Sequence, residues 1–165
     1  MQLDDFFDYK NQLMEDLLTT ESIVRLLNDD ISLENAHKLA YKQVFPYEYV
    51  PETVEEAKTF ICFDVDVQES INKTFLSPTL YVWIFSHKTR LRLVEGGVQT
   101  DKLASEIAKK INGSRFYGLG ELNLYSVRRF APVTDYQGKV MTFYMTEWNR
   151  PSPSNKTIPA NRKTG

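Results

Sequence analysis

Two aspartates in an alternating segment are the first candidates for a metal-binding or catalytic site. Residues 59–67 alternate between two sets of side chains, as a β-strand does, and this places Asp64 and Asp66 on the same side of the strand. Two such carboxylates can ligate a divalent cation, or one of them can act as a general base. No third ligand lies nearby in the sequence, so we expect the pair to bond to a cation across the sheet or to be solvated.

The histidines and the single cysteine make a weak case for catalysis. His37 lies in a short predicted helix, residues 32–41, with no His, Cys or carboxylate at metal-ligand spacing from it. Cys62 lies inside the alternating strand, where we expect it to pack as a small apolar group in a reducing compartment, since it has no partner for an internal disulfide. We therefore predict no catalytic residue, no metal site and no cofactor.

Basic side chains are better candidates, as contacts in an assembly. Lys88, Arg90 and Arg92 follow the most apolar strand, in a segment that is either a ragged strand extension or a protruding loop. Arg128 and Arg129 close a later strand. Residues 149–165 contain no acidic residue and are expected to form a flexible basic C-terminal arm, disordered alone or ordered on a partner. The cations of this arm, which we predict as further assembly contacts, are Arg150, Lys156, Arg162 and Lys163.

Charge is divided unevenly along the chain. The net charge is −2, but residues 1–35 contain nine acidic and two basic side chains, a net charge of −7 against +5 for the rest. This split suits head-to-tail packing of subunits through complementary faces, although a solvated acidic helix beside a mildly basic sheet gives the same pattern. Aromatic and arginine side chains could also bind nucleic acid, but the pI of about 5.7 and the core-like alternation of the aromatics argue against sequence-specific recognition.

Two helical segments are predicted from apolar periodicity. The N-terminal segment ends at Asn28 and is either one bent helix or two, because Thr19 and Thr20 interrupt its apolar stripe. A second helix, residues 101–111, has a tidy inward stripe and is ended by Asn112 and Gly113. The first stripe is Leu3, Phe6, Phe7, Leu13, Met14, Leu17 and Leu18, and the second is Leu103, Ala104, Ile107, Ala108 and Ile111.

The strands complete an α+β prediction. They are expected at residues 59–67, 79–86, 121–130 and 139–148, with a change of phase in the third that suggests either a bulge or two covered faces. The last two would form a hairpin. We therefore predict a mainly antiparallel four-stranded sheet with an N-terminal helical segment and one helix between the strand pairs, the order α-β-β-α-β-β, in a single domain over residues 1–148.

No targeting or membrane segment is expected. The N-terminus is acidic rather than basic and then apolar, and no stretch approaches the roughly eighteen apolar residues that a spanning helix needs.

Four local features resemble the tail-terminator, or tail-completion, proteins of tailed bacteriophages and related contractile particles. They are the Leu-rich N-terminal helix ending in Ile-Val-Arg-Leu-Leu (23–27), the central strand Tyr-Val-Trp-Ile-Phe (81–85), the helix at 100–108 and the closing hairpin that ends at 142–148. The likeness covers about residues 3–148. The longer segment between the first helix and the first strand, and the basic C-terminal arm, depart from the shorter members of that family.

The resemblance implies a small α+β subunit without catalytic residues that forms a ring, commonly a hexamer, and caps the finished tail tube. The implied partners are other copies of the chain, the tail tube protein and head-connector or neck proteins, and the implied location is the head–tail junction of the virion, after synthesis in the bacterial host cytoplasm. Two alternatives stay open: another neck or head-completion connector protein, and a small non-virion α+β enzyme or regulatory domain.

Overall fold

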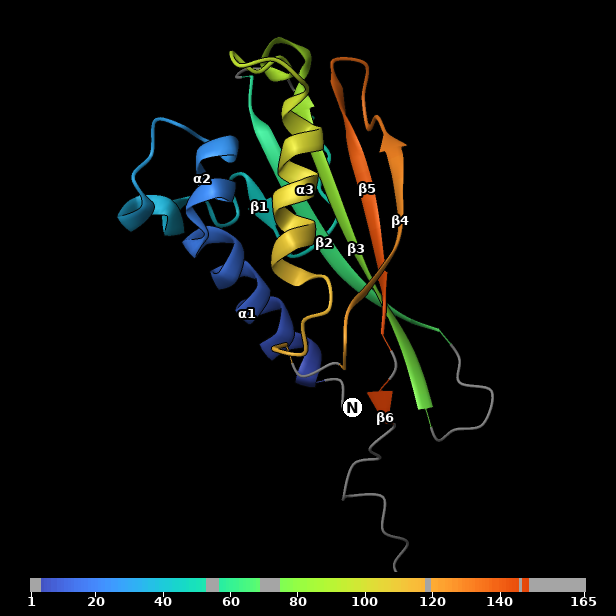
Figure 1. The fold of residues 1–165 in the computed structure, drawn as a ribbon. Coiled ribbons are helices and arrows are strands. Elements are labelled where there is room, and N and C mark those ends of the chain that lie inside the picture. The colour runs from blue at the N-terminus through green and yellow to red at the C-terminus, as the bar shows by residue number, and fades with distance from the viewer. Residues whose placement is uncertain (1–3, 53–56, 69–74, 118–119, 146, 149–165) are drawn as a thin grey trace, which may run out of the picture.

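The computed structural model describes residues 4–52, 57–68, 75–117, 120–145 and 147–148, in which helices pack on one face of a β-sheet (Figure 1). The α-helices are α1 (Asp4–Thr19), α2 (Glu21–Leu27) and α3 (Gln99–Ile111), and the 3₁₀ helices are η1 (Leu33–Leu39) and η2 (Lys88–Arg90). The strands are β1 (Val44–Phe45), β2 (Thr59–Gln68), β3 (Phe75–His87), β4 (Asn123–Phe130), β5 (Tyr136–Tyr144) and β6 (Glu147–Trp148). Within these ranges no helix has both the length and the apolar character needed to cross a bilayer.

The sheet confirms the α+β class but not the strand count. Its order is β1-β2-β3-β5-β4, with β6 paired to the start of β3. The prediction of four antiparallel strands is wrong in detail, because β1 pairs in parallel with β2, Val44 lying opposite Ile61, and because the strand predicted at 139–148 breaks after Tyr144. Strands of two residues are too short to show the alternation by which a strand is recognised in a sequence.

The N-terminal segment is two helices rather than one bent helix. The Thr19 hydroxyl donates to the Glu15 carbonyl at 2.8 Å, and the Thr20 hydroxyl donates to the Asp16 carbonyl at 2.7 Å. Threonine hydroxyls that bond back in this way compete with the backbone and often bend a helix. Thr20 then takes an extended conformation (φ −90°, ψ 107°), and α2 begins at Glu21. The threonine pair that interrupts the apolar periodicity is therefore where α1 ends.

Apolar side chains cover both faces of the central strands. The main core lies between the helices and one face of the sheet, and a smaller cluster lies on the opposite face. Strand β3 occupies the centre of the sheet and carries apolar side chains on both of its faces. The smaller cluster consists of Phe45, Phe60, Cys62, Phe85 and Tyr136, and the main core includes Leu13, Leu17, Ile23, Leu27, Ile61, Phe63, Leu80, Ile84, Leu103, Ile107 and Phe143.

One residue of the predicted apolar stripe of α1 points outward. Phe7 is 71% exposed, whereas Leu13 and Leu17 are buried and Phe6 packs against the core. Adjacent residues lie about 100° apart around a helix, and at the start of α1 the core contacts Phe6 but not Phe7. The prediction that Phe7 shares one face with the rest of the stripe is therefore wrong, and the outer surface of α1 carries a large apolar side chain.

The hairpin of β4 and β5 has two local irregularities. The predicted bulge is confirmed, since the register shifts between Leu124 and Ser126. Gly138 of β5 is closely approached by β3: a Cβ at this position would lie 1.7 Å from the Ile84 carbonyl oxygen and 2.6 Å from the Phe85 Cα. Only a residue without a Cβ fits there, because the neighbouring atoms belong to the backbone.

We expect Gly138→Ala to lower the free energy of unfolding by about 3 kcal/mol, since the strands must separate to admit the methyl group and overpacking of this kind costs roughly 1–3 kcal/mol or more. Urea denaturation followed by circular dichroism measures the change. The neighbouring exposed position provides a control, because Gln137→Ala should change stability by less than about 0.5 kcal/mol. A Gly138→Ala protein as stable as the parent would show that β3 and β5 are not packed as described.

Candidate functional site

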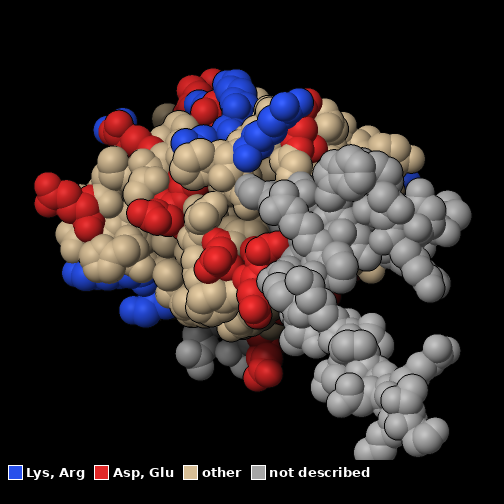
Figure 2. All heavy atoms as spheres, turned by 90° about the horizontal axis from the view of Figure 1, so that it is seen from below, with Lys and Arg blue, Asp and Glu red and all other residues tan. Residues whose placement is uncertain are grey.

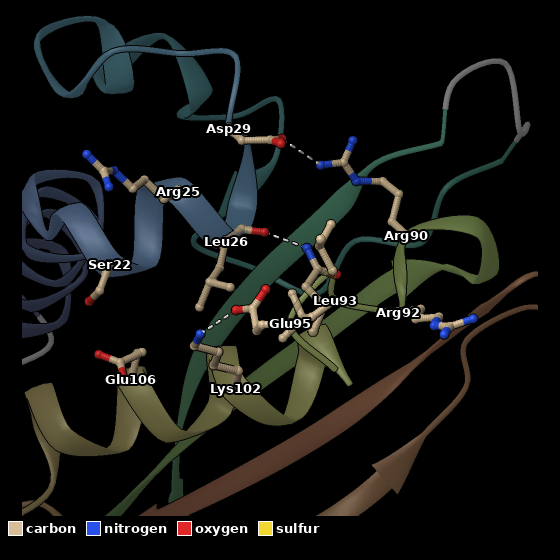
Figure 3. A pocket seen from close by; sticks show the side chains of 12 residues that line it. Ser22, Arg25, Leu26, Asp29, Arg90, Arg92, Leu93, Glu95, Lys102 and Glu106 are labelled. Carbon is tan, nitrogen blue, oxygen red and sulfur yellow. Dashed lines mark hydrogen bonds and ion pairs between the residues drawn. The ribbon is translucent and has the colours of Figure 1, made fainter. Parts of the chain in front are cut away.

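A cleft of about 660 Å³ lies between α2, the segment that follows η2, and the first turns of α3 (Figure 3). Two of the predicted contact residues, Arg90 and Arg92, line this cleft, but their side chains point in different directions (Figure 3). The charged residues that line it are the cations Arg25, Arg90, Arg92 and Lys102 and the acids Asp29, Glu95 and Glu106.

Most of these charges are already paired. Arg90 donates to the Asp29 carboxylate at 3.4 Å, and Lys102 donates to Glu95 at 2.7 Å across the mouth of the cleft (Figure 3). The Lys102 hydrogen bond and charge lower the pKa of Glu95 below its usual value. Arg92 is exposed and points away from the other labelled side chains. The cleft therefore has little net positive charge to offer an anion.

Two buried glutamines, of which Gln99 lines the cleft, join the end of α2 to the rest of the fold. Gln99 at the start of α3 donates to the Leu26 carbonyl of α2 and, at 2.8 Å, to the Thr59 hydroxyl of β2. Gln43 donates to the Leu27 carbonyl at 3.1 Å and to the Thr59 carbonyl at 2.9 Å. The carbonyls at the end of α2, which lack helical partners, are thus satisfied by side chains from elsewhere in the chain. We call Gln43, Thr59 and Gln99 the glutamine cluster.

Sequence reasoning missed the glutamine cluster. Gln43 and Gln99 are 5% and 4% exposed, yet neither belongs to an apolar stripe or a motif, and they lie 56 positions apart. The nearest prediction from the sequence was the helix at residues 101–111. That helix in fact begins at Gln99, after Val98, so the glutamine of its first turn lies buried and turned toward α2.

The other predicted contact residues lie outside the cleft. Lys88 pairs with Asp135 at 2.6 Å, which ties η2 to the turn between β4 and β5 and lowers the pKa of the Asp135 carboxyl. Arg128 and Arg129 are exposed on β4 and have no ion pair within the described part of the chain. The four cations predicted in the C-terminal arm lie outside the described residues, as does the arm itself. The structure therefore groups Arg90 with Arg92 but does not gather all the predicted contacts into one site.

Strand β4 forms an open edge of the sheet. It pairs only with β5, and apolar side chains are exposed on both of its faces. On the face away from the helices, Tyr125 stacks on Tyr144 with ring centroids 4.4 Å apart. The exposed apolar residues of this edge are Leu124 (36%), Tyr125 (65%), Val127 (48%) and, on β5, Tyr144 (43%).

The candidate catalytic or metal-binding residues that the structure describes either bond to other groups of the chain or do not gather into a metal site. Asp64 pairs with Lys10 of α1 at 2.6 Å, so a cation does neutralise it, although from a helix rather than from a neighbouring strand. The Nδ1 atom of His37 lies 3.0 Å from the Glu34 carbonyl oxygen in its own 3₁₀ helix. Among the described residues no three His, Cys, Asp or Glu side chains gather as a metal site would require.

In a comparison with known protein families, the YomW family model matches residues 20–145. The matched region runs from Thr20, just before α2, to the residue after β5, and it covers most of the chain. The chain belongs to the YomW family. The name YomW resembles that of a Bacillus phage-region gene product, which relates this family to phages without giving a role in the particle. No curated protein matches the chain.

In this YomW-family protein, Gln99→Leu should lower the free energy of unfolding by about 1–3 kcal/mol, because the Leu26 carbonyl and the Thr59 hydroxyl would be left buried without this partner. Guanidinium denaturation measures the loss. Gln12→Leu on the exposed side of α1 makes the same chemical change and should have an effect below about 0.5 kcal/mol. Equal stability of the two variants would contradict a capping role for Gln99.

The Cys62 thiol should be inert in the folded YomW protein. Its side chain is buried, and this burial raises the pKa of the thiol to about 12, so little thiolate is present at pH 8. We expect a disulfide reagent to react with Cys62 only after denaturation in guanidinium. Rapid labelling of the native protein at pH 8 would show that this side of β2 opens or is not covered.

Proposed function

We propose that the chain is a ring-forming structural protein of a phage or phage-like particle, a tail terminator that caps the tail tube at the head–tail junction. The observation that carries the proposal is the open edge at β4, where Tyr125 and Val127 are 65% and 48% exposed on a strand with no outer partner in the described chain. Exposed apolar edge strands are templates for unwanted pairing, and native proteins usually cover or blunt them. A ring would cover this one.

The fold supports the same proposal. The main elements follow in the order helix, strand, strand, helix, strand, strand, which resembles that of tail-terminator proteins, with β1 and β6 as short additions. Membership of the YomW family adds a relation to phages. A structural role also agrees with the cleft, where the buried side chain of Gln99 joins α3 to α2 and β2.

A head-completion connector is the second candidate function. It would need the same kind of uncovered subunit surface, and the open β4 edge favours it as much as a terminator. The two differ in the partner that the ring binds: the tail tube for a terminator, and the head connector for a completion protein.

We expect the purified full chain to form closed rings of about six copies, because a surface left open at one edge of each subunit is covered when the ring closes. Light scattering coupled to gel filtration measures the mass, and negative-stain electron microscopy shows the shape. Added to growing tail tubes, the rings should stop elongation. A strict monomer at high concentration, with or without tubes, would refute the proposal, and rings that bind head connectors but not tubes would favour the completion protein.

A further inference from the structure

The outer surface of α1 combines negative charge with one projecting apolar side chain. Phe7 is 71% exposed, and Asp4 and Asp8 beside it are exposed, without ion pairs in the part of the chain that is described. Asp4 and Asp8 are four residues apart, so they are neighbours on the helix surface and repel each other. Figure 2 shows the molecule from below, the end at which α1 starts, and acidic side chains gather near the centre of that surface. A cation from another molecule would relieve this repulsion.

A groove of about 330 Å³ between α3 and β4 has a complementary character. The α3 residues that line it are Asp101, Ala104, Ser105 and Ala108, and the small side chains of the two alanines leave space opposite Leu124 and Val127 of β4. Ala104 is buried but Ala108 is only half-buried. The sheet therefore does not fully cover this side of the predicted inward stripe of α3. The groove is an apolar hollow able to receive a side chain from outside.

Positive charge lies at one end of this groove. Arg129 of β4 is opposite Lys139 of β5 in the sheet register, and Lys139 bonds to Asp101 of α3 at 3.3 Å, so both cations are on the helix-bearing face. Lys139 is neutralised by Asp101, whereas Arg129 is exposed without an ion pair within the described residues. Its neighbour Arg128 points to the opposite face, since adjacent residues of a strand alternate.

The two surfaces lie at opposite edges of the sheet. Helix α1 is fastened to the edge formed by β1 and β2, because Lys10 bonds to the Pro46 carbonyl at 2.9 Å and to Asp64 at 2.6 Å. Strand β4 is the other edge of the sheet, and Figure 1 shows its arrowhead end on the far side of α3 from α1. A contact between two unlike surfaces on opposite sides repeats from copy to copy and closes into a ring when the rotation permits.

We propose that Phe7 of one copy inserts into the groove between α3 and β4 of the next copy, with Asp4 and Asp8 facing Arg129. The proposal rests on the ring-forming function proposed above and names the contact that builds the ring. It joins an aromatic anchor to an apolar hollow and two unpaired carboxylates to an unpaired guanidinium, which is how helices are recognised in grooves.

Direct pairing of β4 with a strand of another copy fits the edge less well. The bulge between Leu124 and Ser126 interrupts the hydrogen-bond ladder that a new strand would need. Arg128 and Arg129 put two charges near the end of the strand, a feature that discourages edge-to-edge pairing. A helix needs no ladder and uses the side chains alone.

The apolar contact is tested with Phe7→Ser and with Ser105→Trp, which fills the groove from an exposed position of α3. Each should raise the concentration needed for half-assembly at least about tenfold, while the melting temperature stays near that of the parent because both sites are exposed. Leu33→Ser removes another exposed apolar side chain, on η1, and should leave assembly unchanged. Rings of normal stability from both test variants would overturn the proposal.

Charge reversal tests the direction of the contact. Arg129→Glu alone and the double variant Asp4→Lys, Asp8→Lys alone should each fail to form rings, and an equimolar mixture should recover rings of alternating composition, since every reversed groove then meets a reversed helix. Arg128→Glu, on the opposite face, should assemble as the parent does. If the mixture forms no rings although the parent protein does, the proposed contact is wrong and the proposed function still stands. If the parent protein forms no rings, the proposed function itself is wrong.

Discussion

The structure depends on hydrogen bonds from distant side chains to the carbonyl groups in the last turn of α2. This helix has seven residues, so its final carbonyls, those of Leu26 and Leu27, have no partners within the helix. Gln99 and Gln43 supply the donors, and both also bond to Thr59 of β2. Each lost hydrogen bond in such a place costs about 1–3 kcal/mol, so the position of α2 against the sheet and α3 is closely specified. The cleft beside it is a consequence of this arrangement.

With the cleft occupied by structural interactions, the surfaces that remain are the two edges of the sheet, and they are unlike. At the β1–β2 edge, α1 is anchored through Lys10 and presents an acidic outer surface with Phe7. At the β4 edge no helix or strand of the described chain covers the exposed apolar side chains. The difference between the edges favours contacts that run in one direction, from copy to copy.

Elements whose side chains follow a simple period were predictable. The alternation in β2 and β3, the stripe of α3 and the phase change in β4 each identified the element, and the bulge was found between Leu124 and Ser126. The candidate site was less predictable: Arg90 and Arg92 were expected to be free contacts, but Arg90 is partly used to hold Asp29 at the wall of the cleft. The groove beside β4 was not predicted, because it is formed by the small size of Ala104 and Ala108 and not by residues that carry chemistry.

Residue type and local spacing were enough to identify the long helices and strands, the burial of Cys62 in a strand, and the concentration of negative charge before residue 36. Only the tertiary structure decided the parallel pairing of β1, the capping of α2 by Gln99 and the neutralisation of Asp64 by Lys10. The Gln99–Leu26 bond joins residues 73 positions apart and the Lys10–Pro46 bond joins residues 36 apart. Contacts of this kind depend on how the chain closes on itself, which no local periodicity encodes.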